Sequence, residues 1–157
     1  MKRLLLLVPT TSYRVGDFLD AAHGLGAEVA VGSDQPQVLE SHGRTVCVDF
    51  RDLDEGVRQI VAYAGRYPLL TIVATDEETT LLAALASREL GLAHNTPESV
   101  EAAGNKFRFR TALANSGLKA PGFSLLSTAD DPQRLADGVV FPGVLKPLAM
   151  SASRGVI

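Results

Sequence analysis

The chain has 157 residues, a net charge of −3 and one cysteine. This length is enough to bury a core in one domain, or in one domain plus a fragment of another. The slightly acidic balance provides no basic surface for nucleic acid. The lone Cys47 excludes an internal disulfide and fits a reducing compartment. Its neighbours in Thr45–Val48 predict that Cys47 is buried in a strand.

The apolar run Leu4–Val8 is predicted to be the buried first strand of a parallel sheet. Because Pro9 ends the run, it is too short for the apolar region of a secretory signal and far too short to span a membrane. We therefore expect a soluble cytoplasmic protein with no membrane partner.

Strands and amphipathic helices are predicted to alternate through the first two thirds of the chain. Apolar spacing predicts helices at Val15–Ala22, Leu53–Ala64 and Thr75–Leu90, the last with Thr75 and Glu78 as a capping box. The other predicted elements here are strands at Glu28–Val31, Thr45–Val48 and Leu69–Ala74 and a short helix at Gln35–Ser41. This pattern predicts an α/β fold, an open parallel Rossmann-like sheet with helices on both faces. We expect strand one to be central, with strands two and three on one side and strand four on the other.

Regular patterns are weaker in the last third. We expect a short strand and turn at 93–97, a brief helix, and a helix from Asn105 to Asn115 that buries Phe109, Ala112 and Leu113. Further predicted elements are strands at Phe123–Leu126 and Val139–Lys146 and a short helix at Asp131–Ala136. We place a domain boundary near Ala120–Pro121, which gives a first domain of residues 1–120 and a small α+β unit of residues 121–157.

Two lysines form the strongest chemical pattern. Lys106 lies in the first turn of the helix that Asn105 caps, and Lys146 ends a predicted strand before a loop of small residues. Small side chains let backbone N–H groups approach a polyphosphate, and lysine offsets its charge. Either lysine alone is more typical of a solvated surface.

The stretches Asn105–Leu113, Ser116–Pro121 and Phe141–Pro147 resemble the helix, turn and lysine strand of the ATP-grasp superfamily. Members of that superfamily use ATP and Mg²⁺ to activate a carboxylate as an acyl phosphate. The resemblance implies a pre-ATP-grasp domain at 1–120 and an incomplete ATP-grasp subdomain at 121–157, related to carbamoyl-phosphate-synthase-like and amino-acid ligases. It assigns ATP binding to Lys106, Lys146, Ser151, Ser153, Arg154 and Gly155.

The loop after Lys146 departs from the family pattern. Residues 149–152 stand where relatives often carry glycines, and only Gly155 remains after Arg154. Positive φ angles are costly without glycine, so the loop is expected to cradle phosphate less closely. A plain hairpin turn of small residues is the alternative interpretation.

A second group of polar residues is predicted at the carboxyl edge of the sheet, where open parallel sheets bind ligands. In several ATP-grasp ligases this edge helps to hold the second substrate. The resemblance therefore implies a small-molecule substrate near Thr10, Thr11, Ser12, Tyr13, Asp76 and Glu77. The capping box that begins at Thr75 accounts for part of this sequence without a ligand.

The resemblance implies the N-terminal part of an ATP-dependent carboxylate-amine or carboxylate-thiol ligase. No acidic residue follows Asp137, so we expect the metal ligands beyond Ile157 and no ligase activity in this chain alone. We expect residues 122–157 to be more mobile than the first domain and to be held by another copy of the chain or by the remainder of a ligase. The alternative is a non-catalytic, Rossmann-like protein, derived from such a ligase, that binds a small ligand or a partner.

Several other classes of protein are disfavoured. The first strand is not followed by the G-x-G-x-x-G of dinucleotide-binding enzymes. The three histidines and the single cysteine are scattered, unlike zinc ligands. The G-x-S-x-G pattern of α/β hydrolases is absent from the sequence.

Overall fold

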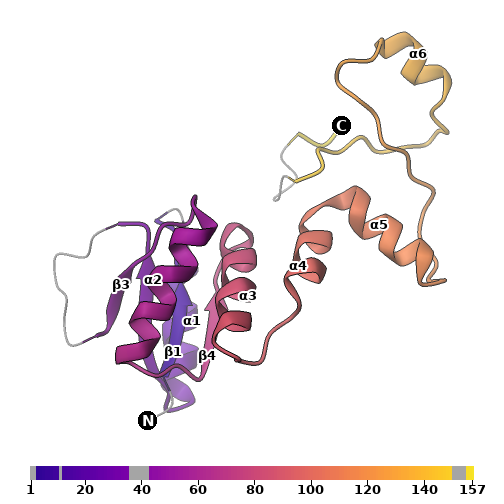
Figure 1. Ribbon diagram of the computed structural model, residues 1–157. Helices are drawn as coiled ribbons and strands as arrows, with labels where there is room; N and C mark the ends of the chain where they lie inside the picture. Colours follow the sequence, from indigo (N-terminus) through magenta and orange to yellow (C-terminus); the bar gives the residue numbers. More distant parts are fainter. Residues whose placement is uncertain (1–2, 11, 36–42, 150–154) are drawn as a thin grey trace. The chain divides into compact units, whose positions relative to one another are not determined.

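A computed structural model describes residues 3–10, 12–35, 43–149 and 155–157 (Figure 1). The chain divides into two compact units, Met1–Val100 and Glu101–Ile157. This division by compactness falls within a helix, α4 (Pro97–Gly104). The predicted domain boundary near Ala120–Pro121 stays a prediction.

The first unit contains one sheet of four parallel strands. The strands are β1 (Arg3–Leu7), β2 (Glu28–Ser33), β3 (Thr45–Cys47) and β4 (Thr71–Ala74), in the order β3-β2-β1-β4. In the central strand, Leu5 pairs with Ala30 of β2 on one side and with Ile72 of β4 on the other. The predicted parallel fold and strand order are confirmed, with strand ends that shift by one or two residues.

Helices cover both faces of this sheet. They are α1 (Val15–Gly24), α2 (Leu53–Arg66) and α3 (Thr80–Glu89). In Figure 1, α1 lies behind the sheet, and α2 and α3 pack against each other in front of it. These positions follow from the topology. The connection from β1 to β2 and the connection from β3 to β4 run in opposite directions across the sheet. Because such connections are right-handed, their helices α1 and α2 lie on opposite faces.

The core explains why the first strand is apolar from Leu4 to Leu7. Leu5 and Leu7 join the cluster formed with Ile60 of α2 and Leu82 of α3, and all four side chains are fully buried. Leu6 points to the opposite face and is also buried. A strand that is covered on both faces needs this continuous apolar run.

Three predictions for the first unit differ from the structure. The third helix is preceded by a 3₁₀ turn, η1 (Glu77–Thr79), and the Thr75 hydroxyl bonds to Leu7 and Asp76 instead of forming a capping box. Cys47 is exposed, because β3 is the edge strand. Residues 93–95, predicted as a short strand, form no regular element. Most of the predicted helix Gln35–Ser41 lies outside the described residues.

The second unit contains α5 (Lys106–Asn115) and α6 (Pro132–Asp137). Both were predicted, and the cap at Asn105 is confirmed. The predicted buried face of α5 is wrong, since Phe109 and Ala112 are not buried and Phe109 is 42% exposed. The helix instead turns Phe107 inward, where its ring meets Phe123 edge-on at 5.6 Å between centroids.

The predicted strands Phe123–Leu126 and Val139–Lys146 do not form among the described residues of this unit. An extended segment becomes a stable strand only when neighbouring strands pair with its backbone, and a pair of isolated strands is marginal. One strand-like feature is present, because Leu145 and Ile157 exchange two backbone hydrogen bonds of 2.9 and 3.0 Å. Across the parts of the chain that the structure describes, no helix is long and apolar enough to cross a membrane.

Candidate functional site

The start of α5 places the first of the two predicted lysines. Asn105 has extended backbone angles, φ −114° and ψ 112°, and its side-chain oxygen accepts from the N–H groups of Phe107 and Arg108. Such a cap fixes the residue at which the helix begins. Lys106 is therefore the first helical residue, and it is half-buried.

The same helix start contacts the segment that carries the second lysine. The backbone N–H of Lys106 donates to the carbonyl oxygen of Leu148 at 3.0 Å. Lys146 lies two residues before Leu148 and its side chain is exposed. The hydrogen bond therefore brings together two sequence motifs that lie some forty positions apart.

Leu145 and Ile157, which lie before and after the small-residue loop, pair through two backbone hydrogen bonds. Gly155 has φ +67°, a left-handed conformation that favours glycine. Gly155, the one glycine of the loop, therefore lies at a position whose backbone angle favours glycine. Ser151, Ser153 and Arg154 lie outside the described residues.

The carboxyl edge of the sheet brings two pairs of polar residues into contact. Asp34, after β2, accepts from the backbone N–H of Thr10 at 3.2 Å and from its hydroxyl at 3.4 Å. Thr75, after β4, donates to Asp76 at 2.9 Å. The first pair joins residues that follow two neighbouring strands, as expected where parallel strands end together, whereas the second pair lies within the one loop after β4.

The loop after β1 adds an exposed cation to this edge. Arg14 lies over the ring of Tyr13 at 5.6 Å. A hydrogen bond to Tyr13 and the nearby charge of Asp76 both raise the pKa of Arg14. Of the other predicted substrate residues, Ser12 accepts from Arg14 N–H at 3.4 Å, Glu77 is exposed, and Thr11 lies outside the described residues.

Comparison with known families identifies part of the chain. Residues 19–94 match the model of the ATP-grasp N-terminal domain. This region is similar to the ATP-grasp N-terminal domain. The match covers most of the four-stranded sheet and includes Asp34 and Asp76, while Thr10 precedes it and both lysines follow it.

A curated relative of this chain is longer. The uncharacterized protein y4rH of Sinorhizobium fredii is 25% identical over 160 residues, which are 99% of this chain and 34% of that protein. The chain therefore spans about a third of the length of this relative.

Solved structures share the fold. The L-amino acid ligase of Bacillus licheniformis superposes on 88% of this chain and 41% of its own, with a TM-score of 0.67 and 18% identity. The N5-carboxyaminoimidazole ribonucleotide synthetase of Thermus thermophilus superposes on 98% of this chain and 39% of its own, with a TM-score of 0.65 and 18% identity. The phosphoribosylglycinamide synthetase of Anaerococcus prevotii superposes on 87% of this chain and 40% of its own, with a TM-score of 0.55 and 15% identity.

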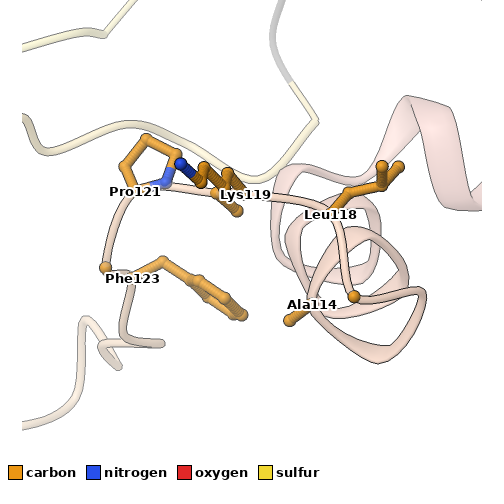
Figure 2. A pocket seen from close by; sticks show the side chains of 8 residues that line it. Ala114, Leu118, Lys119, Pro121 and Phe123 are labelled. Atoms are coloured by element: carbon orange, nitrogen blue, oxygen red, sulfur yellow. The ribbon is translucent and has the colours of Figure 1, made fainter.

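A shallow hollow in the second unit is separate from the predicted site residues. Figure 2 shows Phe123 and Ala114 on opposite sides of it, with Leu118, Lys119 and Pro121 along the connecting chain. Among the described residues that line it, Lys119 carries the one polar side-chain group. Of the residues predicted to bind ATP, the described ones, Lys106, Lys146 and Gly155, do not line this hollow.

Sequence reasoning missed two parts of the candidate site. The Leu148 carbonyl has no sequence signal, because every residue carries one and only the tertiary fold selects it. Arg14 was part of the first loop but was not chosen as a site residue. Its signal was its place among polar residues directly after a buried strand.

Proposed function

We propose that this chain is the N-terminal part of an ATP-dependent ligase that joins a carboxylate to an amine or a thiol. The ATP-grasp N-terminal domain at residues 19–94 supports this class of enzyme. The observation that carries the proposal is the hydrogen bond from Lys106 N–H to the Leu148 carbonyl. It brings the helix start that bears one lysine against the segment that bears Lys146, which fits one shared site for a triphosphate.

In the proposed reaction, a carboxylate oxygen of the first substrate attacks the γ-phosphorus of ATP, and ADP leaves. The amine or thiol then attacks the carbon of the acyl phosphate, loses a proton and displaces inorganic phosphate. Lys106 and Lys146 act as point charges beside the phosphates. Ser151 and Ser153 donate hydroxyl hydrogen bonds and Arg154 adds charge, while Gly155 lets the backbone approach closely.

Such a transfer uses Mg²⁺ held by protein carboxylates. In the described ranges, no three His, Cys, Asp or Glu side chains gather where they could hold a metal ion. The sequence contains no acidic residue after Asp137. The residues that the structure describes therefore do not fit the metal. We propose that its ligands come from polypeptide outside these 157 residues and that this chain alone does not ligate.

The carboxyl edge of the sheet is the proposed site of a small-molecule substrate. Thr10, Tyr13 and Asp76 contribute hydroxyl, phenol and carboxylate groups, together with Thr11, Ser12 and Glu77. Arg14 lies near enough to Asp76 for that carboxylate to raise its pKa. An edge with both charges is suited to a polar substrate that carries an amine and a carboxylate.

The second unit is proposed to contact further protein, either another copy of the chain or the remainder of a ligase. Several of its large apolar side chains are exposed, including Val140 at 86%, Phe141 at 75% and Val144 at 66%. Exposed apolar surface of this kind marks interaction sites. We propose that the protein acts in the cytoplasm, as the single exposed thiol suggests.

Nucleotide binding by the purified chain tests the proposed function. Lys106→Ala and Lys146→Ala should each weaken the binding of ATP with Mg²⁺ by about 10- to 100-fold, because each removes a charge-assisted contact to phosphate. Isothermal titration calorimetry measures the affinity. Lys119→Ala removes an equal charge from the same unit and should bind like the wild type. Unchanged affinity in both of the first two variants would refute the nucleotide site and leave the non-catalytic alternative.

A further inference from the structure

We propose that Asn105 is a positioning residue that joins the start of α5 to the loop segment around Leu148. This inference rests on the proposed nucleotide site. The first N–H groups of a helix have no partner within the helix. Here Lys106 N–H donates to Leu148, and the N–H groups of Phe107 and Arg108 donate to the Asn105 side chain at 3.1 and 3.0 Å.

The inference rests on which partner each N–H group at the helix start has. The Asn105 side chain satisfies the second and third helical N–H groups, and its own carbonyl accepts from Phe109 at 2.8 Å. The N–H of Lys106 is the one among the first three that the cap leaves to another segment, and that segment is the loop. The backbone at this helix start therefore anchors the loop, so α5 contributes to the site through the Lys106 side chain.

The anchor also fixes Leu148 relative to Lys106. Leu148 is held by α5, and the pairing of Leu145 with Ile157 holds the two ends of the loop together. Any change in where α5 begins thus moves the Lys106 side chain and the Leu148 anchor together. Asn105 sets that beginning, and it does so without touching the phosphates itself.

The hydrogen bond can be tested separately from the lysine charge. Lys106→Ala removes the side chain and keeps the N–H, whereas Lys106→Pro removes both. Proline is well tolerated at the first helical position, and the extended conformation of Asn105 suits a residue before proline. We expect Lys106→Pro to bind ATP with Mg²⁺ about 3- to 10-fold more weakly than Lys106→Ala, as for the loss of a cap-type bond.

The role of Asn105 is tested by Asn105→Ala, which should weaken nucleotide binding by about 3- to 10-fold and speed hydrogen exchange at the Lys106 amide. Asn105→Ser, a neutral residue that also caps well, should restore both. Asp131→Ala is the matched control, because Asp131 caps α6 through Gln133 N–H in the same unit. It should leave nucleotide affinity and Lys106 exchange unchanged.

The outcomes separate this inference from the proposed function. If the wild type binds nucleotide and Asn105→Ala binds equally well, or if Lys106→Pro equals Lys106→Ala, the positioning role is wrong. If the wild-type chain binds no nucleotide, the proposal that these 157 residues hold a nucleotide by themselves fails. The link between helix and loop is then decided by exchange alone: faster exchange at the Lys106 amide in Asn105→Ala supports it, and unchanged protection overturns it.

Discussion

Thr75 and Leu7 tie the carboxyl ends of β4 and β1 together. The buried Thr75 hydroxyl shares its one proton between the Leu7 carbonyl at 3.0 Å and Asp76 at 2.9 Å, and the Thr75 N–H donates to the same Leu7 oxygen at 3.2 Å. Because Thr75 is only 5% exposed, its hydroxyl has little access to water and its protein partner matters. This contact lies at the edge where the polar residues after the strands gather.

Thr75→Val should lower the free energy of unfolding by about 1 kcal/mol, because it removes a buried hydrogen bond and keeps the shape of the side chain. Urea denaturation measures the change. Thr80→Val is the control, since the hydroxyl of Thr80 bonds to Glu77 at an exposed position where water replaces it. Equal losses in the two variants would contradict the importance of the buried bond.

Gly43→Ala should be more destabilising than Gly26→Ala. Both glycines have positive φ, +72° and +63°, so both variants bear the cost of a left-handed conformation, about 1–2 kcal/mol. A Cβ at Gly43 would also lie 2.5 Å from the Tyr67 ring, whereas one at Gly26 would meet nothing within 4 Å. We expect an additional loss of about 1–3 kcal/mol in urea denaturation of Gly43→Ala. Similar stabilities for the two variants would show that Tyr67 yields without cost.

Asp49 should make the free energy of unfolding depend on pH in the acidic range. Its carboxylate accepts from the N–H groups of Arg51 at 2.8 Å and Asp52 at 3.2 Å, and these bonds lower the pKa of Asp49. A lowered pKa means that the unfolded chain binds more protons, so stability is present above about pH 4 and declines as the pH falls below it.

Asn in place of Asp49 keeps an acceptor oxygen and removes the titration. The slope of unfolding free energy against pH, measured between about pH 2 and 5, should therefore be smaller in Asp49→Asn than in the wild type. An identical slope would mean that this carboxylate has the same pKa in both states.

The purified chain, incubated with ATP, Mg²⁺ and a mixture of amino acids, should release no phosphate above background. The proposed transfer needs metal-bound phosphates, and this chain has no acid after Asp137. A colorimetric phosphate assay over several hours measures this, with Lys146→Met as the matched protein. Sustained release by the wild type that Lys146→Met abolishes would show that the chain is catalytic by itself.

Local sequence determined the parts of this protein whose stability depends on near neighbours or on burial of a whole segment. Leu4–Val8 predicted a central strand because only a strand covered on both faces requires apolar residues throughout. The cap at Asn105 was equally predictable, because its bonds reach only the next few residues.

Tertiary structure decided which distant groups meet. Cys47 and its apolar neighbours predicted burial, but the strand order puts β3 at the edge and exposes the thiol. Phe123–Leu126 and Val139–Lys146 have strand-like sequences, yet a strand exists only where another backbone pairs with it. The Leu148 carbonyl became a partner of Lys106 for the same reason. Backbone groups are identical at every residue, so sequence patterns predict where a segment bends or is buried, and the fold alone selects which backbone groups pair.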